Sequence, residues 1–245
     1  MGRALLCLLI VGAGWTTEAV QNPATRTMVF QGNKRPYQLL VPAQAAAGPV
    51  PLIVLLHGSG RDGVSQMRVW QDLGRDQGVA VAAPDAFDSR GWSLDTEGPD
   101  YFQALVEAVK KDVRVDDRRV YLFGHSAGGH QALGIGLLES EYFAAIAVHA
   151  GGLNPSQEIF VQQARRKIPV AMWHGTADRV VPVDFARSTR DMLKGMDIPV
   201  QLTEIANHTH DYYSRAKRIN EEAWTFLKQH ALATDPLFRQ YVFGK

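Results

Sequence analysis

One stretch of the chain, residues 119–129, reads Arg-Val-Tyr-Leu-Phe-Gly-His-Ser-Ala-Gly-Gly. Its first five residues form a mostly apolar run that predicts a buried strand, and residues 130–138 continue with the pattern of a helix. The turn between them has the spacing G-x-S-x-G, with Ser126 between Gly124 and Gly128. A Cβ atom at either flanking position would collide with the adjoining strand or helix, so the turn needs glycine there. The stretch therefore predicts a strand–turn–helix unit that lifts Ser126 to the carboxyl end of a sheet.

Apolar segments of strand length alternate with amphipathic segments of helix length around this unit. The predicted strands are residues 52–56, 79–83, 119–123, 143–148, 170–173 and 200–205, and the predicted helices are residues 64–77, 101–113, 130–138, 159–166, 185–194 and 215–229. Continuously apolar strands separated by helices predict a mostly parallel central sheet with helices on both faces. Residues 25–30 and 35–41, joined by Gly32-Asn33, predict an antiparallel hairpin at one edge. The fold class is therefore α/β.

Length and charge restrict the class of protein further. The 245 residues are enough for one sizeable domain, which we place at residues 20–245. Residues 231–245 look like a tail that packs weakly or not at all. The formal net charge is +1, and there is no basic stripe or block of like charges. We therefore expect no nucleic-acid partner.

The first 19 residues are predicted to be a signal peptide. Arg3 gives a short positive start, residues 4–14 form an apolar run too short to span a bilayer, and Thr17 and Ala19 have the small-residue spacing of a cleavage site. We expect a periplasmic or secreted protein without stable membrane insertion after the signal is removed. Cys7, the only cysteine, lies in this segment, so the mature chain would have no thiol for a disulfide or a metal.

A serine hydroxyl becomes a good nucleophile only when a base takes its proton. In the strand–turn–helix arrangement, the acid and the base follow the serine after later strands. Asp178 lies in the loop after residues 170–173, and a turn aspartate is the alternative interpretation. His208 and His210 both follow the last strand. We predict His210 as the base because it is nearer the closing helix, and we keep His208 as the alternative.

Two backbone amides are predicted to stabilise a transition-state oxyanion. The first is the N–H of Ala127, the residue after the nucleophile. The second should come from the loop after residues 52–56, where Ser59 is the first candidate and Gly60 the next. His57 and His174 precede glycine at strand ends and are expected to be structural hydrogen-bonders. His130 and His149 are expected to pack near the core. Trp92 has two interpretations, as a pocket-lining aromatic or as a surface hydrophobe.

These motifs resemble those of one known family. Residues 55–60 (Leu-Leu-His-Gly-Ser-Gly), 115–121 (Val-Asp-Asp-Arg-Arg-Val-Tyr), 124–129 and 174–178 (His-Gly-Thr-Ala-Asp) resemble the polyhydroxybutyrate-depolymerase and feruloyl-esterase branch of the α/β-hydrolase serine esterases. That branch has Gly-His at the base, where this chain has Asn207-His208. Residues 210–213 (His-Asp-Tyr-Tyr) resemble instead the base segment of S-formylglutathione hydrolases.

The resemblance implies hydrolysis of a small-molecule or polymeric carboxylic ester through an acyl-enzyme, without a cofactor or a metal. It also implies export. No long insertion separates residues 143–148 from Asp178, so any lid is small and the cleft is open.

Three other interpretations remain. The run His208-Thr209-His210-Asp211 is close to the metal motif His-x-His-x-Asp-His, but Tyr212 and Tyr213 break that spacing. An exported peptidase of the same fold would act on amides, although the chain has no extra domain to select peptides. A non-catalytic binding module is the third, because fold alone does not dictate function.

Overall fold

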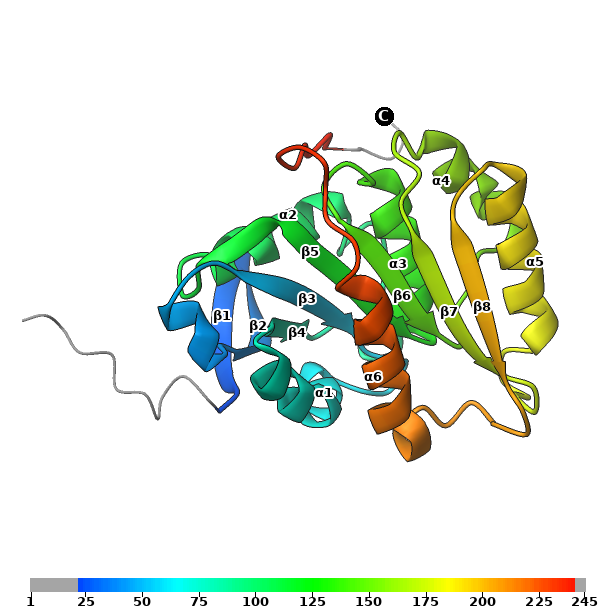
Figure 1. Ribbon diagram of the computed structural model, residues 1–245, viewed down its shortest axis with the longest axis horizontal. Helices are drawn as coiled ribbons and strands as arrows, with labels where there is room; N and C mark the ends of the chain where they lie inside the picture. Colours follow the sequence, from blue (N-terminus) through cyan, green and yellow to red (C-terminus); the bar gives the residue numbers. More distant parts are fainter. Residues whose placement is uncertain (1–21, 241–245) are drawn as a thin grey trace, which may run out of the picture.

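The computed structural model describes residues 22–240, and its centre is an eight-stranded sheet in the order β1-β2-β4-β3-β5-β6-β7-β8 (Figure 1). Strands β3 to β8 run parallel to one another, whereas β1 and β2 form an antiparallel hairpin whose strand β2 also pairs antiparallel with β4. The strands are β1 (Ala24–Phe30), β2 (Asn33–Leu40), β3 (Val50–Leu56), β4 (Ala80–Pro84), β5 (Val115–His125), β6 (Ala145–His149), β7 (Val170–Gly175) and β8 (Val200–Ile205). This is the predicted α/β-hydrolase sheet with its N-terminal hairpin.

Helices cover both faces of the sheet. On one face lie α1 (Gly63–Gln77) and α6 (Ala216–Leu227), which Figure 1 shows in front of the strands. The opposite face carries α2 (Pro99–Val109), α3 (Ala127–Leu138), α4 (Glu158–Gln163) and α5 (Val183–Gly195). Short 3₁₀ turns lie at Ala43–Ala46, Pro155–Gln157 and Tyr213–Arg215. The predicted layer order of helix, sheet and helix is confirmed.

Alternate side chains of each central strand enter two separate cores. In β3, Ile53 and Leu55 pack with the layer of α1 and α6, whereas Val54 and Leu56 pack with the layer of α2 and α3. All four side chains are fully buried. A strand buried on both faces has no polar side, which is why its sequence is apolar without alternation.

The C-terminal segment contradicts the predicted weak packing. Leu232 is 3% exposed, its N–H donates to Arg118 O at 2.9 Å, and its carbonyl accepts from Arg118 Nε at 2.7 Å. Further along, the Leu237 N–H donates to Glu141 O, and the Phe238 ring lies 5.6 Å from the ring of Tyr142. The sequence did not reveal this packing because the contacts are few and join segments that are far apart in the chain.

The predicted signal peptide lies outside the described residues. Within residues 22–240, no helix has the length and apolar character needed to cross a bilayer.

Candidate active site

Ser126 lies on the turn between β5 and α3, with φ 53° and ψ −119°. Such a positive φ is rare for a residue other than glycine and is a form of stored backbone strain. The two flanking glycines make this turn possible. A Cβ on Gly124 would lie 2.1 Å from Gly128 O, and one on Gly128 would lie 2.2 Å from Leu56 O. Both positions are therefore closed to any side chain, as the motif predicts.

A chain of hydrogen bonds connects three of the predicted site residues. His210 Nε2 lies 2.8 Å from Ser126 Oγ, and His210 Nδ1 lies 2.7 Å from Asp178 Oδ2. They come from the turn after β5, the loop after β7 and the loop after β8. The carboxyl ends of parallel strands meet at one edge of the sheet, which is why residues so distant in sequence come together. The arrangement allows the imidazole to take a proton from the hydroxyl while the carboxylate holds the ring.

The carboxylate of Asp178 is buried and well supplied with donors. Its Oδ1 accepts the amide hydrogens of Val180 and Val181, each at 2.9 Å, so Oδ2 is left to face His210. Burial alone would raise the pKa of this carboxyl. The hydrogen bonds from His210 and from the two amides outweigh burial, and the pKa lies below its usual value. Asp178 is therefore ionised at neutral pH.

The ring of His208, the alternative base, makes no hydrogen bond to Ser126 Oγ, which is bonded to His210. Its side chain is buried, its ring lies 5.3 Å from the ring of His149, and burial lowers its pKa. Its carbonyl accepts from the Ala177 N–H at 2.9 Å. A Cβ on Gly175 would lie 2.1 Å from that carbonyl, so the loops after β7 and β8 pack backbone against backbone. His208 thus connects the acid loop to the base loop.

The loop after β3 lies against the nucleophile. A Cβ on Gly58 would lie 3.4 Å from Ser126 Cβ, so there is only a narrow space between the loop and the serine. The Gly60 N–H is already used, because it donates to Ser89 O at 2.7 Å. Within residues 22–240, the amides of Ser59 and Ala127 have no protein acceptor. The predicted oxyanion donors Ser59 and Ala127 therefore keep free N–H groups, whereas the N–H of Gly60, the next candidate, is occupied.

Sequence reasoning missed an aromatic layer behind the base. The His125 ring lies 5.1 Å from the ring of His210 and is stacked on Tyr212 at 5.1 Å. Its Nδ1 lies 3.0 Å from His149 Nδ1. Burial lowers the pKa of His125 to about 3 and that of His149 well below its usual value, so both rings are neutral. The sequence signal for this layer was the imidazole ring of His125 inside the G-x-S-x-G turn.

The other predicted histidine roles agree with the structure. His57 Nδ1 lies 2.9 Å from Gly58 O, His174 Nε2 lies 2.8 Å from Val181 O, and His130 Nδ1 lies 2.6 Å from Gly152 O. None of these rings touches Ser126 Oγ. No cluster of three or more histidine, cysteine, aspartate or glutamate side chains in the described part of the chain is arranged to hold a metal ion.

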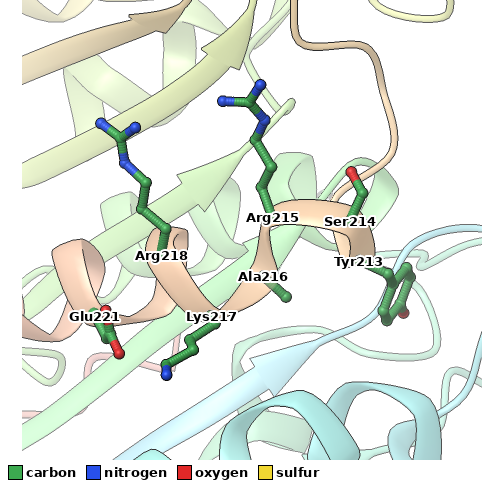
Figure 2. A pocket seen from close by; sticks show the side chains of 7 residues that line it. All are labelled: Tyr213, Ser214, Arg215, Ala216, Lys217, Arg218 and Glu221. Atoms are coloured by element: carbon green, nitrogen blue, oxygen red, sulfur yellow. The ribbon is translucent and has the colours of Figure 1, made fainter.

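Two surface depressions border the loops that carry Asp178 and His210. A groove of about 730 Å³ borders the acid loop and is lined by His130, Asn154, Gln157, Val180, Val181, Pro182, Asp184, Phe185 and Ser188. Val180 is 69% exposed in it. A second depression, of about 400 Å³, lies at the start of α6. Figure 2 shows that its Arg215 and Lys217 side chains point in different directions, so they do not converge on one ligand.

The fold and the strained serine turn together define an α/β hydrolase. A family model described as "Putative esterase" matches residues 30–218, and the chain belongs to this esterase family. Its motifs resemble those of the feruloyl-esterase branch, and the prediction of a carboxylic ester hydrolase is confirmed at the level of the family.

Two curated relatives and one solved structure illustrate the likeness. The chain is 30% identical over 180 residues to the "Putative esterase NocK" of Nocardia uniformis, covering 65% of this chain and 49% of that protein. It is 30% identical over 174 residues to the "Probable feruloyl esterase C" of Aspergillus niger, covering 67% and 62%. The chain thus spans about half to three-fifths of the length of these relatives. The S-formylglutathione hydrolase of Agrobacterium tumefaciens superposes with a TM-score of 0.71 at 19% identity, over 84% of this chain and 94% of that one, and supports the fold.

Proposed function

We propose that this protein hydrolyses a carboxylic ester through an acyl-enzyme, with Ser126 as nucleophile, His210 as base and Asp178 as its orienting acid. The observation that carries the proposal is the hydrogen-bond chain from Asp178 through His210 to Ser126 Oγ. It stands on the strained turn of a fold whose family is an esterase family.

In the proposed acylation step, Ser126 Oγ attacks the ester carbonyl carbon while His210 Nε2 takes its proton. The carbonyl oxygen becomes an oxyanion, which the N–H groups of Ser59 and Ala127 stabilise. His210 then gives the proton to the departing alcohol, and the acyl group stays on Ser126. Asp178 accepts the Nδ1–H of the imidazole, fixes its tautomer and stabilises the imidazolium that forms. Water, activated by His210 in the same way, hydrolyses the acyl-enzyme and regenerates the serine.

The groove beside the acid loop fits an ester in which one of the two groups joined by the ester bond is largely apolar and carries no negative charge. Val180 and Phe185 supply apolar surface to its lining, which also includes the amides of Asn154 and Gln157 and the carboxylate of Asp184. Relatives named as feruloyl esterases and as an acetylxylan esterase suggest hydroxycinnamoyl and acetyl esters as first substrates. A comparison of acetyl, butyryl, feruloyl and hydroxybutyrate esters would rank the acyl groups, and an aminoacyl anilide would report peptidase activity.

Replacement of the nucleophile tests the proposal. Ser126→Ala should lower kcat on p-nitrophenyl acetate by about 10⁵-fold or more, because the triad acts as a unit. The variant should unfold at a similar temperature, since only a hydroxyl is lost. A purified, folded Ser126→Ala protein with more than about a hundredth of wild-type turnover would contradict the mechanism.

We also propose that residues 1–19 are removed on export and that residues 20–245 form one mature domain. The support is the succession of Arg3, the apolar run 4–14 and the small residues Thr17 and Ala19. Mass spectrometry of the exported protein should find Val20 or Gln21 at its N-terminus. An exported protein that begins at Met1 would overturn this.

A further inference from the structure

We propose that Trp92 is a positioning residue for the oxyanion hole, because its indole N–H holds the backbone of the loop that carries the Ser59 amide. The inference rests on the proposed function and concerns the same site. The segment 86–92, which follows β4, is outside the triad and outside the nucleophile turn.

Three hydrogen bonds join this segment to the oxyanion loop. Trp92 Nε1 donates to His57 O at 2.8 Å, and the Ala86 N–H donates to His57 Nε2 at 3.0 Å. The Gly60 N–H donates to Ser89 O at 2.7 Å. The contacts fall on both sides of Ser59, one residue after it and two residues before it. Ser59 itself is exposed and makes no backbone hydrogen bond of its own within residues 22–240, so its direction depends on these neighbours.

The peptide plane explains how a contact at His57 reaches the Ser59 N–H. Ala86 donates to His57 Nε2, so the proton of the neutral ring is on Nδ1, which donates to Gly58 O at 2.9 Å. The Gly58 carbonyl and the Ser59 N–H belong to one planar peptide unit and point in opposite directions. Fixing the carbonyl therefore fixes the amide. Trp92 holds the other end of this arrangement through the His57 carbonyl, and its ring lies 4.9 Å from the His57 ring.

Hydrogen bonds and a ring contact anchor this segment to the rest of the fold. Glu97 is fully buried, and its carboxylate accepts from Arg35 Nη2 at 2.5 Å and from the Phe87 N–H at 2.9 Å. The Trp92 ring is half-buried and lies 6.0 Å from the ring of Phe102. A Cβ on Gly91 would lie 3.9 Å from Ser59 Oγ and 4.0 Å from Ala127 Cβ, so the segment passes beside both proposed oxyanion donors. A segment anchored in this way can keep the Ser59 N–H in a fixed direction.

Trp92→Phe tests the inference, because it keeps an aromatic ring and removes the indole N–H. Loss of a whole oxyanion donor lowers kcat by about 10²- to 10³-fold, so misdirecting one should lower kcat by about tenfold. KM should stay within about twofold, since the donor acts on charge that develops only in the transition state. Trp224→Phe is the matched control. Its Nε1 donates to Gln77 Oε1 at 3.1 Å on the packed side of α6, and its loss should leave kcat unchanged.

The affinity for a trifluoromethyl ketone is a second measurement, and a general loss of stability would not change it. Ser126 Oγ adds to its carbonyl carbon, the serine proton passes to His210, and the ketone oxygen becomes an oxyanion in the hole. Its affinity for Trp92→Phe should fall by the same factor as kcat/KM. Trp92→Leu, which also removes the ring beside His57, should lose at least as much, and either variant that is folded by circular dichroism serves the test.

The inference is overturned if folded Trp92→Phe keeps kcat within about twofold of wild type, if only KM changes, or if Trp224→Phe loses as much activity. Each of these results leaves the proposed function standing, provided that wild type is active and Ser126→Ala is not. An inactive wild-type protein would instead overturn the proposed function.

Discussion

In the proposed mechanism, the oxyanion loop (residues 57–62) and the base loop (residues 206–212) serve the same nucleophile, Ser126, in different ways. The first offers a backbone N–H, and neighbouring main chain and one indole hold it in place. The second offers an imidazole, and its loop is anchored by the buried phenol of Tyr212, which accepts from Trp70 Nε1 at 2.8 Å and donates to Asn220 Oδ1 at 2.5 Å. A backbone N–H is present whichever side chain the residue has, whereas an imidazole is present only if the residue is histidine. Substitutions should therefore have much larger effects in the base loop.

The sharpest contrast is between the two histidines of the base loop. His210→Ala should lower kcat by about 10⁵-fold or more, as loss of the nucleophile does, because it removes the proposed base that is hydrogen-bonded to Ser126 Oγ. His208→Gln should lower kcat by less than about tenfold, since His208 supports the loop through its backbone carbonyl. Steady-state kinetics on both purified variants decides. An inactive His208→Gln with an active His210→Ala would reverse the assignment and leave the serine mechanism intact.

Asp178→Asn should come next. The amide has nearly the same shape, but its NH₂ group disfavours the imidazole tautomer that donates from Nδ1. A fall in kcat of about 10³- to 10⁴-fold is expected, with KM little changed. Asp191→Asn, an exposed change on α5 that removes one carboxylate charge, is the control and should keep full activity. A fully active Asp178→Asn would show that Asp178 only closes its own turn with Val180 and Val181.

The neutral histidines behind the base should make stability depend on pH. The pKa values of His125 and His149 are depressed in the folded protein, so the unfolded chain binds more protons below about pH 6.5, and stability is lost as pH falls. Between pH 7 and pH 5, each such histidine should reduce the free energy of unfolding by up to about 2 kcal/mol. Urea unfolding across this range should show the decline. His149→Gln should have a shallower slope and Trp224→Phe an unchanged one; an unchanged slope in His149→Gln would contradict the prediction.

The smallest effect is expected at the residue that departs from the family's Gly-His pattern. Asn207 has φ 57°, and its exposed side chain needs only to permit this left-handed conformation. Asn207→Gly should therefore keep kcat and change the free energy of unfolding by less than about 1 kcal/mol. Asn207→Val should lose about 1–2 kcal/mol, because a β-branched residue is strained there. Thermal unfolding compares them, and equal stability of both variants would show that the loop relaxes.

Asparagine and glycine thus perform the same task at position 207. They are the residues that most readily adopt a left-handed backbone, so the mismatch with the depolymerase branch concerns chemistry less than turn geometry. The structure also separates two meanings of a histidine in this loop. His208 follows the left-handed turn and is buried, whereas His210 is two residues further on and reaches Ser126.

Local pattern was enough for the alternation of strands and helices, the strained serine turn and the two loops where acid and base must lie. Strand and turn preferences act over a few residues, so the sequence alone determined these features. Burial of the central strands on both faces is also visible in the sequence, because such strands could not contain polar side chains. The helix that the pattern began at residue 130 starts at Ala127, since helix boundaries depend on turn geometry that apolar spacing does not record.

Tertiary structure alone decided which histidine reaches the hydroxyl, which glycine amide is already used, and how the chain end packs. Each depends on contacts between segments far apart in sequence: His210 with Ser126, Gly60 with Ser89, and Leu232 with Arg118. The same holds for Trp92, whose hydrogen bond to His57 no local pattern announces. Hydrogen bonds over a few ångströms determine which groups lie beside Ser126, and only the folded chain brings their partners together.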